Sequence, residues 1–118
     1  MAGQGGARFD GIRPATFSVK RSEREDLVVL TVAGELDMAT VDRFAALVEG
    51  IPPGRRVVVD LGDLEFIDSA GLHLLLNLDL RSRQEGWELA LARPRTAVLR
   101  MLKLLKIDSR IPILDAPP

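Results

Sequence analysis

One serine stands where a hydroxyl group could carry regulatory chemistry. Ser69 follows a buried-strand pattern and opens a leucine-rich helical pattern, so the sequence places it at the start of a helix. Backbone N–H groups there lack intrahelical partners and the helix dipole adds partial positive charge, so an anion on Ser69 would be tolerated. Phosphate is the obvious anion, and it would add roughly −1.5 to −2 charge near neutral pH. The structural alternative is that Ser69 is only a helix N-cap, a common role for serine.

Two aspartates also stand before helical patterns. Asp37 precedes the pattern of residues 41–48, and Asp68 directly precedes Ser69. We expect Asp37 to be the N-cap of the first helix. As a carboxylate in a loop near strand ends, it could also contact a partner or help position the phosphate-bound metal of a kinase. Asp68 could repel or orient a phosphate on Ser69, or it could simply end the loop.

The sequence gives little support to an enzyme. Ser69 and His73 are four residues apart and would share a helix face, which raises the hypothesis of a hydrolase. However, the Gly-x-Ser-x-Gly elbow is absent and no third orienting residue is indicated, so we predict no catalytic residue. Gly62 and Gly71 are nine apart without a Gly-Lys-Ser/Thr sequence, so neither a P-loop nor a dinucleotide motif is present. We expect no cofactor, and we expect His73 to be a partly exposed helix residue.

Composition narrows the class further. The 118 residues fit one domain, and a formal net charge of −1 gives no electrostatic footprint for nucleic acid or an anionic membrane. There is no cysteine and one histidine, so we predict no disulfide and no metal site. No apolar run approaches the roughly 20 residues of a membrane span. We therefore expect a cytoplasmic protein.

Residue periodicity predicts an α/β domain. Residues 1–14 are glycine-rich and are expected to form a flexible arm before a domain over residues 15–118. The predicted strands are residues 16–20 and 27–33, which form an antiparallel hairpin, then 57–61, 87–91 and an edge strand or tail at 111–114. The predicted helices cover 41–48, the segment from Ser69 to Gly86, and a segment capped by Thr96, and 62–68 is expected to be a loop. The result is one mixed sheet of four to five strands with three to four helices packed on it.

The helix after Ser69 carries more leucine than one buried face needs. Leu72, Leu75, Leu76 and Leu80 cluster on one side, and two further leucines widen the apolar arc to roughly 240°. Either a neighbouring helix covers the surplus or part of it is a docking surface. We expect the neighbouring helix, because surplus leucine usually belongs to a core.

Four segments together resemble the STAS family, the module of bacterial anti-sigma factor antagonists and of sulfate-transporter tails. They are residues 34–37 (Gly-Glu-Leu-Asp), the strand at 57–61, residues 66–72 (Phe-Ile-Asp-Ser-Ala-Gly-Leu) and the ending at 107–114. The resemblance spans roughly residues 16 to 115. In the antagonists that this chain resembles, the serine directly after the aspartate is phosphorylated by a partner kinase, and the matching residue here is Ser69.

The resemblance implies a partner switch. The unphosphorylated protein would bind an anti-sigma factor of the serine-kinase type, which would release its sigma factor. Phosphorylation of Ser69 would end that complex, and a phosphatase acting on Ser69 would restore the unphosphorylated, binding form. The implied contact residues are Glu35, Asp37, Asp68, Ser69, Gly71 and Leu72. For Glu35, an exposed salt bridge is the structural alternative. We expect a monomer or a weak dimer that binds neither nucleic acid nor membrane.

Two departures from the family pattern affect these expectations. Many members have a second hydroxyl residue where this chain has Ala70, so Ser69 is the only hydroxyl in the motif. Relatives often have a glycine where Lys106 follows the last helix, so we expect that helix to run on slightly or to end without a glycine cap.

The alternative function is a STAS scaffold or regulatory subunit of a stress-sensing complex or of a membrane lipid transporter, without sigma-factor output.

Overall fold

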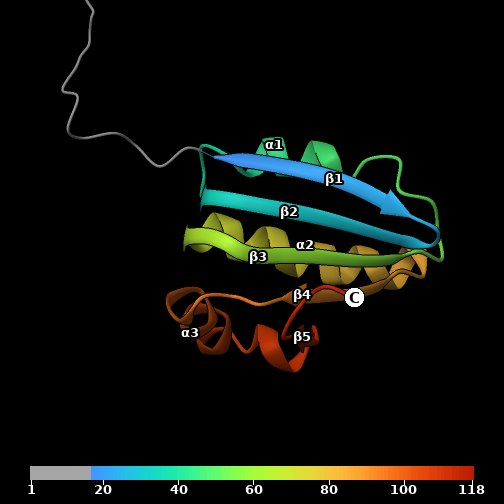
Figure 1. The fold of residues 1–118 in the computed structure, drawn as a ribbon. Helices are drawn as coiled ribbons and strands as arrows, with labels where there is room; N and C mark the ends of the chain where they lie inside the picture. Colours follow the sequence, from blue (N-terminus) through green and yellow to red (C-terminus); the bar gives the residue numbers. More distant parts are fainter. Residues whose placement is uncertain (1–16) are drawn as a thin grey trace, which may run out of the picture.

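A five-stranded sheet organises the molecule (Figure 1). The computed structural model describes residues 17–118, so the arm expected at residues 1–14 lies outside the described residues. The elements are β1 (Ser18–Arg24), β2 (Leu27–Leu36), α1 (Val41–Leu47), β3 (Arg56–Ile67), α2 (Ser69–Glu85), β4 (Glu88–Ala92), α3 (Thr96–Leu104), the 3₁₀ helix η1 (Ile107–Ser109) and β5 (Ile113–Leu114). The strand order is β1-β2-β3-β4-β5, with β1 antiparallel to β2 and all other pairs parallel. The predicted α/β fold is therefore confirmed.

The predicted antiparallel hairpin is confirmed, but both strands are longer than expected: β1 continues past residue 20 to Arg24, and β2 continues past residue 33. Arg24 pairs with Leu27, so only two residues form the turn. β2 continues beyond residue 33 to Leu36 because it keeps pairing with β3 through two shifts in register. One shift lies between Gly34 and Glu35, and Gly34 has a φ of 90°, a left-handed conformation that favours glycine.

The expected loop at residues 62–68 is wrong. β3 runs on to Ile67, and its last residues pair with β2 down to Leu36 opposite Ile67. Leu64 and Ile67 are buried in this extension, while Asp63 and Glu65 are exposed. Burial of these two apolar side chains and pairing with β2 explain why a polar, glycine-containing stretch stays extended. The extension carries the chain directly into α2.

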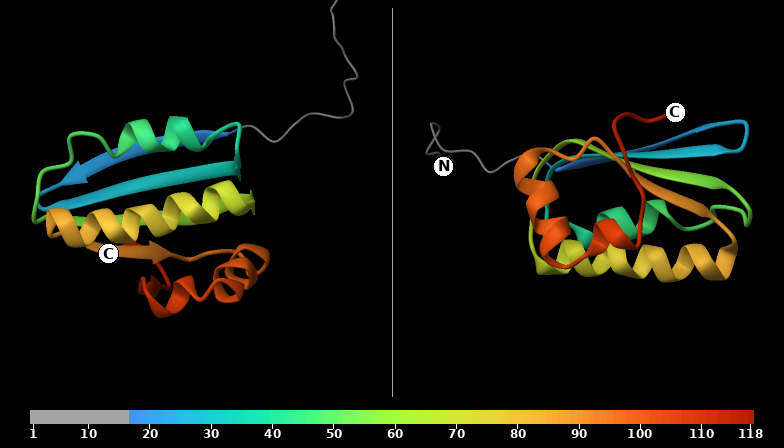
Figure 2. Two further views of the ribbon diagram at one scale, coloured as in Figure 1. Left: turned by 180° about the vertical axis from the view of Figure 1, so that it is seen from behind. Right: turned by 90° about the horizontal axis from the view of Figure 1, so that it is seen from below.

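Helices α1 and α2 cover one face of the sheet, and the C-terminal segment reaches the other (Figure 2). The largest side chains with almost no exposure in the main core include Phe44, Leu30, Leu36, Leu61, Leu72, Leu75, Leu91 and Leu102. The surplus leucines of α2 divide: Leu74 and Leu76 pack half-buried against this core, whereas Leu80 is 52% exposed. The prediction that a neighbouring helix covers the surplus leucines is therefore wrong for Leu80. Among residues 17–118, no helix is both long enough and apolar enough to cross a membrane.

Helix α2 contains a buried aspartate. Asp79 is 4% exposed, and its carboxylate accepts hydrogen bonds from Arg83 on the same helix and from Arg110 beyond η1. The Arg110 Nη2–Asp79 Oδ2 distance is 2.8 Å. This pair ties the C-terminal region to α2, because a buried carboxylate needs charged partners to replace water.

The ends of α3 depart from the predicted pattern. Thr96 is the first helical residue, but the N-cap position is Arg95, and neither forms a side-chain cap, so the predicted Thr96 cap is wrong. The helix ends at Leu104 without running on, and two residues later Lys106 adopts the left-handed conformation at a φ of 58°. Lys106 thus occupies the position at which helices usually place glycine.

This strained lysine predicts a stabilising substitution. Lys106→Gly should raise the free energy of unfolding by about 1 kcal/mol. A left-handed residue with a Cβ costs roughly 1–2 kcal/mol, and part of the relief is offset because glycine loses more conformational entropy on folding. Urea unfolding of both proteins measures the difference. Lys106→Ala is the matched control, since it removes the charge but keeps the Cβ. An equal gain in both variants would contradict the backbone explanation.

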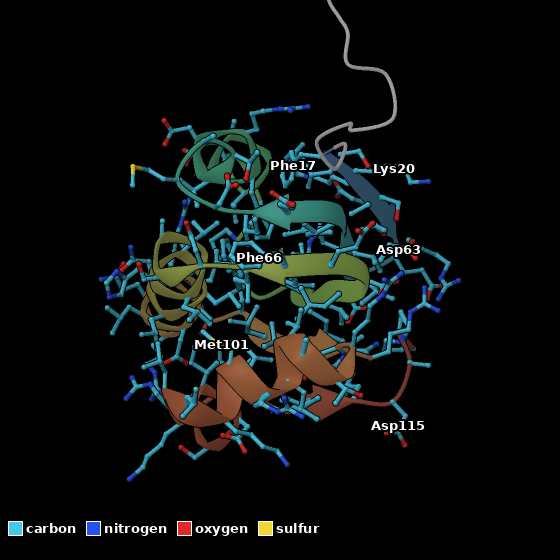
Figure 3. All side chains as sticks on the ribbon, turned by 90° about the vertical axis from the view of Figure 1, so that its left-hand side faces the viewer. Phe17, Lys20, Asp63, Phe66, Met101 and Asp115 are labelled. Atoms are coloured by element: carbon cyan, nitrogen blue, oxygen red, sulfur yellow. The ribbon has the colours of Figure 1, made fainter. Side chains whose placement is uncertain are left out.

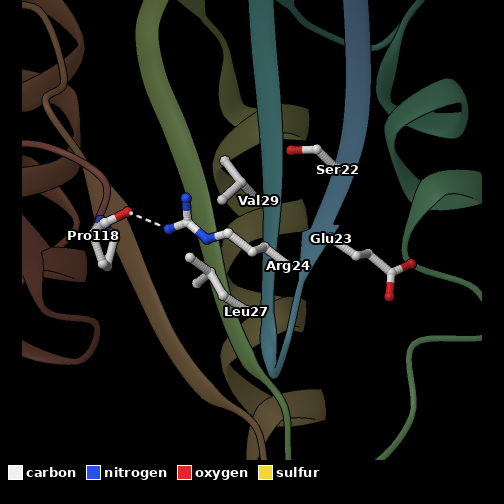
Figure 4. A pocket seen from close by; sticks show the side chains of 6 residues that line it. All are labelled: Ser22, Glu23, Arg24, Leu27, Val29 and Pro118. Atoms are coloured by element: carbon white, nitrogen blue, oxygen red, sulfur yellow. Dashed lines mark hydrogen bonds between the residues drawn. The ribbon is translucent and has the colours of Figure 1, made fainter.

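The face of the sheet opposite α1 and α2 carries a smaller apolar cluster. Leu27, Val58 and Ala92 are buried there, with Val29 and Leu114 packed against them. The C-terminal residues cross this face, where Arg24 Nη2 donates to the Pro118 carbonyl oxygen at 3.3 Å (Figure 4). The hollow beside this contact, also lined by Ser22, lies at the turn end of the hairpin.

A bidentate ion pair on β3 predicts a dependence of stability on acid pH. Asp60 is 4% exposed, and Arg93 Nε and Nη2 each donate to one of its oxygens at 2.9 Å. The Arg93 hydrogen bonds hold the pKa of Asp60 below its ordinary value, although burial works in the opposite direction. The stabilisation is therefore complete above the unfolded-state pKa of about 3.9 and is lost as the pH falls through the lower folded-state pKa.

Asp60→Asn should test this dependence. The variant should lose about 2 kcal/mol at pH 7, the order expected for hydrogen bonds to a charged group. As the pH falls below about 4, the stability gap between wild type and variant should narrow, because the wild-type carboxylate becomes protonated. Urea unfolding at several pH values measures the gap. A gap that stays constant down to pH 2 would contradict the assignment.

Candidate functional site

The parallel ends of β2 and β3 bring the two sequence motifs together. Leu36 pairs with Ile67, and the Asp68 N–H donates to the Leu36 carbonyl oxygen at 3.2 Å. The segment after β2 and the start of α2 therefore lie side by side at the carboxyl edge of the sheet. Figure 3 views the molecule from this end.

Asp68, and not Ser69, caps α2. The Asp68 Oδ1 accepts from the Gly71 N–H at 3.0 Å, which is the N-cap interaction of the helix. Its Oδ2 accepts from the Met38 N–H at 3.2 Å and so holds the segment after β2. The interpretation of Ser69 as the helix cap is therefore wrong, and Asp68 has a structural role at the centre of the site.

Ser69 is the first residue of α2, and it is exposed. Its hydroxyl group makes no hydrogen bond to any other residue of 17–118, and the N-cap hydrogen bond of α2 is formed by Asp68 instead. His73 lies one turn further along and is also exposed, and no hydrogen bond within the described chain joins the two side chains. The Ser69 hydroxyl is thus available to a macromolecule that approaches this end.

Asp37 organises the turn before α1 but does not occupy its N-cap position. Its Oδ1 accepts from the Ala39 N–H at 3.0 Å, and its own N–H donates to the Thr40 hydroxyl oxygen at 2.9 Å. The N-cap position belongs to Thr40, whose side chain instead donates to the Glu35 carbonyl oxygen at 2.8 Å. The predicted Asp37 cap is wrong by three residues, because the carboxylate closes a local turn and the helix starts after that turn.

Gly71 and Leu72 lie beneath the site. Leu72 is 2% exposed, and Gly71 packs so closely that an added Cβ would lie 2.6 Å from the Leu36 carbonyl oxygen. Both residues therefore hold α2 against the ends of β2 and β3. Both residues are buried in this structure, so a partner could contact them only through the residues that cover them.

Two exposed apolar side chains lie on the segments next to Ser69, and the sequence analysis did not single out either. Met38 is 80% exposed and Phe66 is 50% exposed. Phe66 pairs with Glu35 across β2 and β3, so it stands beside one of the predicted contact residues. A sequence signal existed for Met38, since it is a large apolar residue directly after the Gly-Glu-Leu-Asp motif.

A groove of about 540 Å³ opens beside Ser69 between the end of β3 and α3, and we call it the β3–α3 groove. It is lined by Phe66, Ile67, Asp68, Ser69, Ala97, Val98, Arg100 and Met101. Most of these side chains are apolar, and Met101 comes from α3, where it is labelled in Figure 3. The contribution of α3 was missed because no local pattern connects that helix to the Ser69 motif.

The described chain gives no sign of a metal centre. Within residues 17–118, no three side chains of His, Asp or Glu are grouped so that they could hold a metal ion. This end of the molecule presents the Ser69 hydroxyl, carboxylates engaged in backbone hydrogen bonds, and exposed apolar side chains.

The chain is similar in sequence and fold to anti-sigma factor antagonists. The chain is 26% identical over 102 residues to the anti-sigma F factor antagonist of Paenibacillus polymyxa, which covers 84% of this chain and 87% of the relative. The crystal structure of a putative anti-sigma factor antagonist from Thermotoga maritima matches with a TM-score of 0.75 and 25% identity, over 83% of this chain and 86% of that one.

A second solved structure and a family match agree with these likenesses. An anti-sigma factor antagonist from Mycobacterium paratuberculosis matches with a TM-score of 0.69 and 25% identity, over 86% of this chain and 87% of that one. The sequence model of the family described as "Mlab, STAS domain" matches residues 19–115. This match spans most of the chain, and the protein therefore belongs to the STAS domain family.

Proposed function

We propose that this protein is an anti-sigma factor antagonist controlled by phosphorylation of Ser69. The unphosphorylated form binds an anti-sigma factor of the serine-kinase type, which then releases its sigma factor. Phosphorylation of Ser69 by that partner ends the complex, and a phosphatase restores the binding form. The protein is thus a substrate and a binding partner, not an enzyme. The observation that carries this proposal is the exposed Ser69 hydroxyl at a helix start that Asp68 already caps.

The surface around Ser69 has the character of a protein contact. Phe66 lines the same groove as Ser69, and the Met38 N–H donates to the adjacent Asp68. Both expose large apolar area, and exposed apolar patches with polar rims commonly mark interaction sites. Glu35, Asp37 and the Asp68 carboxylate supply the polar rim, all of them half-buried. A partner that covers Met38 and Phe66 would also cover Ser69. Related proteins are named anti-sigma factor antagonists, which supports an anti-sigma factor as this partner.

A phosphate on Ser69 would act through charge and desolvation. A group of nearly two negative charges inside a contact must lose its water, and burial of a charge without a matched partner is costly. Asp68 is the next residue, so the added charge would also stand close to an existing carboxylate. In the free protein, the phosphate would stay exposed to water at the N-terminus of α2, which favours anions. The modification would therefore weaken the complex far more than it would weaken the fold.

Affinity capture from native extracts tests the proposal. Wild type, Ser69→Asp and the control Ser22→Asp serve as parallel baits, and bound proteins are identified by mass spectrometry. Ser22 is an exposed serine near the hairpin turn, so its variant adds the same charge away from the site. We expect one ATP-binding anti-sigma factor to be held by wild type and Ser22→Asp and to be lost from Ser69→Asp.

Other outcomes would contradict the proposal. If all three baits hold the same partners, Ser69 does not control binding. If the partners are transporter subunits or a large scaffold assembly, the alternative functions within the STAS family apply instead. In either case the antagonist interpretation would have to be abandoned.

A further inference from the structure

The β3–α3 groove connects Ser69 to a cation on a different element. Ser69 lines the groove from α2, and Arg100 lines it from α3. Both residues are exposed. An arginine side chain can lay its apolar stem along an apolar surface while its guanidinium group stays in water. Arg100 can therefore extend along the apolar lining of the groove.

Arg100 is the unengaged cation that faces this groove. No ion pair within the described residues involves it. The preceding cation on this helix start, Arg95, donates from Nε to the Gly62 carbonyl oxygen at 3.0 Å. Lys103 lines a neighbouring hollow that does not include Ser69. On α2 itself, the charged or titratable neighbours of Ser69 are Asp68, which repels a phosphate, and His73, one turn away.

We infer that Arg100 binds the phosphate of phosphorylated Ser69 across the β3–α3 groove. This inference rests on the proposed function, since it takes phosphoserine at position 69 as its starting point. Arginine presents a planar fork of N–H donors that matches phosphate oxygens, so the pair would be a charge-assisted, bidentate contact. Asp68 disfavours a phosphate that turns back toward β2, which leaves the α3 side as the favourable direction.

The pair would also change the shape of the site. Phe66 and Met101 line the same groove, so an ion pair that spans it lies over their apolar surface. Phosphorylation would then close the groove to a side chain of the partner, in addition to the charge that it places on the contact surface. The modified protein would carry its own occupant of the groove.

Phosphorus NMR on the full chain tests the inference without a kinase or a partner. Phosphoserine is installed at position 69 during translation, and its second pKa, about 6 for a free phosphoserine, is followed by titration. We expect that pKa to be about 0.5 higher in Arg100→Gln than in the otherwise unmodified phosphoprotein, the size of an exposed ion pair. Lys103→Gln is the matched control and should leave the pKa unchanged. About 1 M salt should remove most of the difference.

The methionine methyl groups give a second, independent signal. The chain has three methionines, Met1, Met38 and Met101, so their methyl resonances are easily separated. We expect phosphorylation to shift the Met101 signal, and we expect Arg100→Gln to remove that shift. Met38 reports the local effect of the phosphate charge and should respond equally in both proteins.

Two results would overturn the inference. An identical pKa in the parent phosphoprotein and in Arg100→Gln would show that no pair forms. A rise in the pKa caused by His73→Gln, without one from Arg100→Gln, would place the phosphate along α2 instead. Because the phosphate is installed without a kinase, failure here leaves the proposed function standing. Failure of the proposed function would appear separately, as the absence of a regulated partner.

Discussion

Gly71→Ala should destabilise the protein by about 2 kcal/mol, although alanine is the better helix former. An added Cβ would lie 2.6 Å from the Leu36 carbonyl oxygen and 2.7 Å from Ile67 Cγ1. That carbonyl group already accepts from the Asp68 N–H, so the backbone cannot easily move away. Overpacking typically costs about 1–3 kcal/mol or more, which outweighs a gain of about 1 kcal/mol in helix propensity.

Thermal and urea unfolding measure this effect, and Ala70→Gly is its control. A loss of 2 kcal/mol should lower the melting temperature by about 10 °C for a domain of this size. Ala70 is the preceding residue of α2 and is half-buried, so its variant reports the intrinsic cost of glycine at this helix start. If Gly71→Ala stabilises the protein by as much as Ala70→Gly destabilises it, the close approach of α2 to the strand ends does not require glycine at position 71.

Phosphorylation of Ser69 should weaken the complex with the anti-sigma factor by about 100-fold. Each 1.4 kcal/mol corresponds to a factor of ten in the dissociation constant, so this loss corresponds to about 3 kcal/mol. A desolvated phosphate between Asp68 and the partner accounts for a penalty of that order. The contact of Phe66 with the partner would be lost with it, because Phe66 lines the same groove as the modified residue.

Titration calorimetry with the purified partner measures the two affinities. The phosphoprotein is compared with wild type and with Ser69→Ala, which removes the hydroxyl group without adding charge. Because most interface residues cost less than about 1 kcal/mol when truncated, and serine is seldom among the exceptions, Ser69→Ala should bind within about threefold of wild type. Equal affinity of the phosphorylated and unmodified proteins would contradict the charge mechanism. An equal loss in Ser69→Ala would instead assign the effect to the hydroxyl group.

The order of the elements followed directly from residue periodicity. The apolar run at residues 57–61 predicts a strand covered by neighbours, and it forms the centre of β3, between β2 and β4. The alternating hairpin strands and the leucine-rich helix after Ser69 were predicted for the same reason. In each of these segments the core side chains repeat with the local period, so a local pattern contains the necessary information.

The extended end of β3 could not be predicted from local patterns. Gly62, Asp63 and Glu65 make residues 62–66 resemble a loop. They remain extended because β2, about thirty residues earlier, pairs with them through shifts in register. Such pairing depends on a distant segment. The position of Phe66 beside Glu35 is a consequence of the same pairing.

The capping residues show a different limit of sequence analysis. Asp37, Asp68 and Ser69 all have side chains that commonly cap helices. Which one does so depends on the path of the loop: Asp68 caps α2, while Asp37 closes a turn with Thr40. The sequence showed which residues have capping side chains, but not which of them caps each helix. The part contributed by α3, including Arg100, required the tertiary structure because that helix follows a separate strand.

The most direct test of the central claim is to map the phosphate after the protein is incubated with its captured partner and ATP. Trypsin cleavage after Arg56 and Arg81 releases residues 57–81, a peptide in which Ser69 is the only hydroxyl residue. Mass spectrometry of this peptide therefore reports on that single side chain. We predict that the peptide gains one phosphate and that the partner dissociates as it does so. Phosphate found only on other peptides, or no phosphate while the partner cycles on and off, would contradict the account.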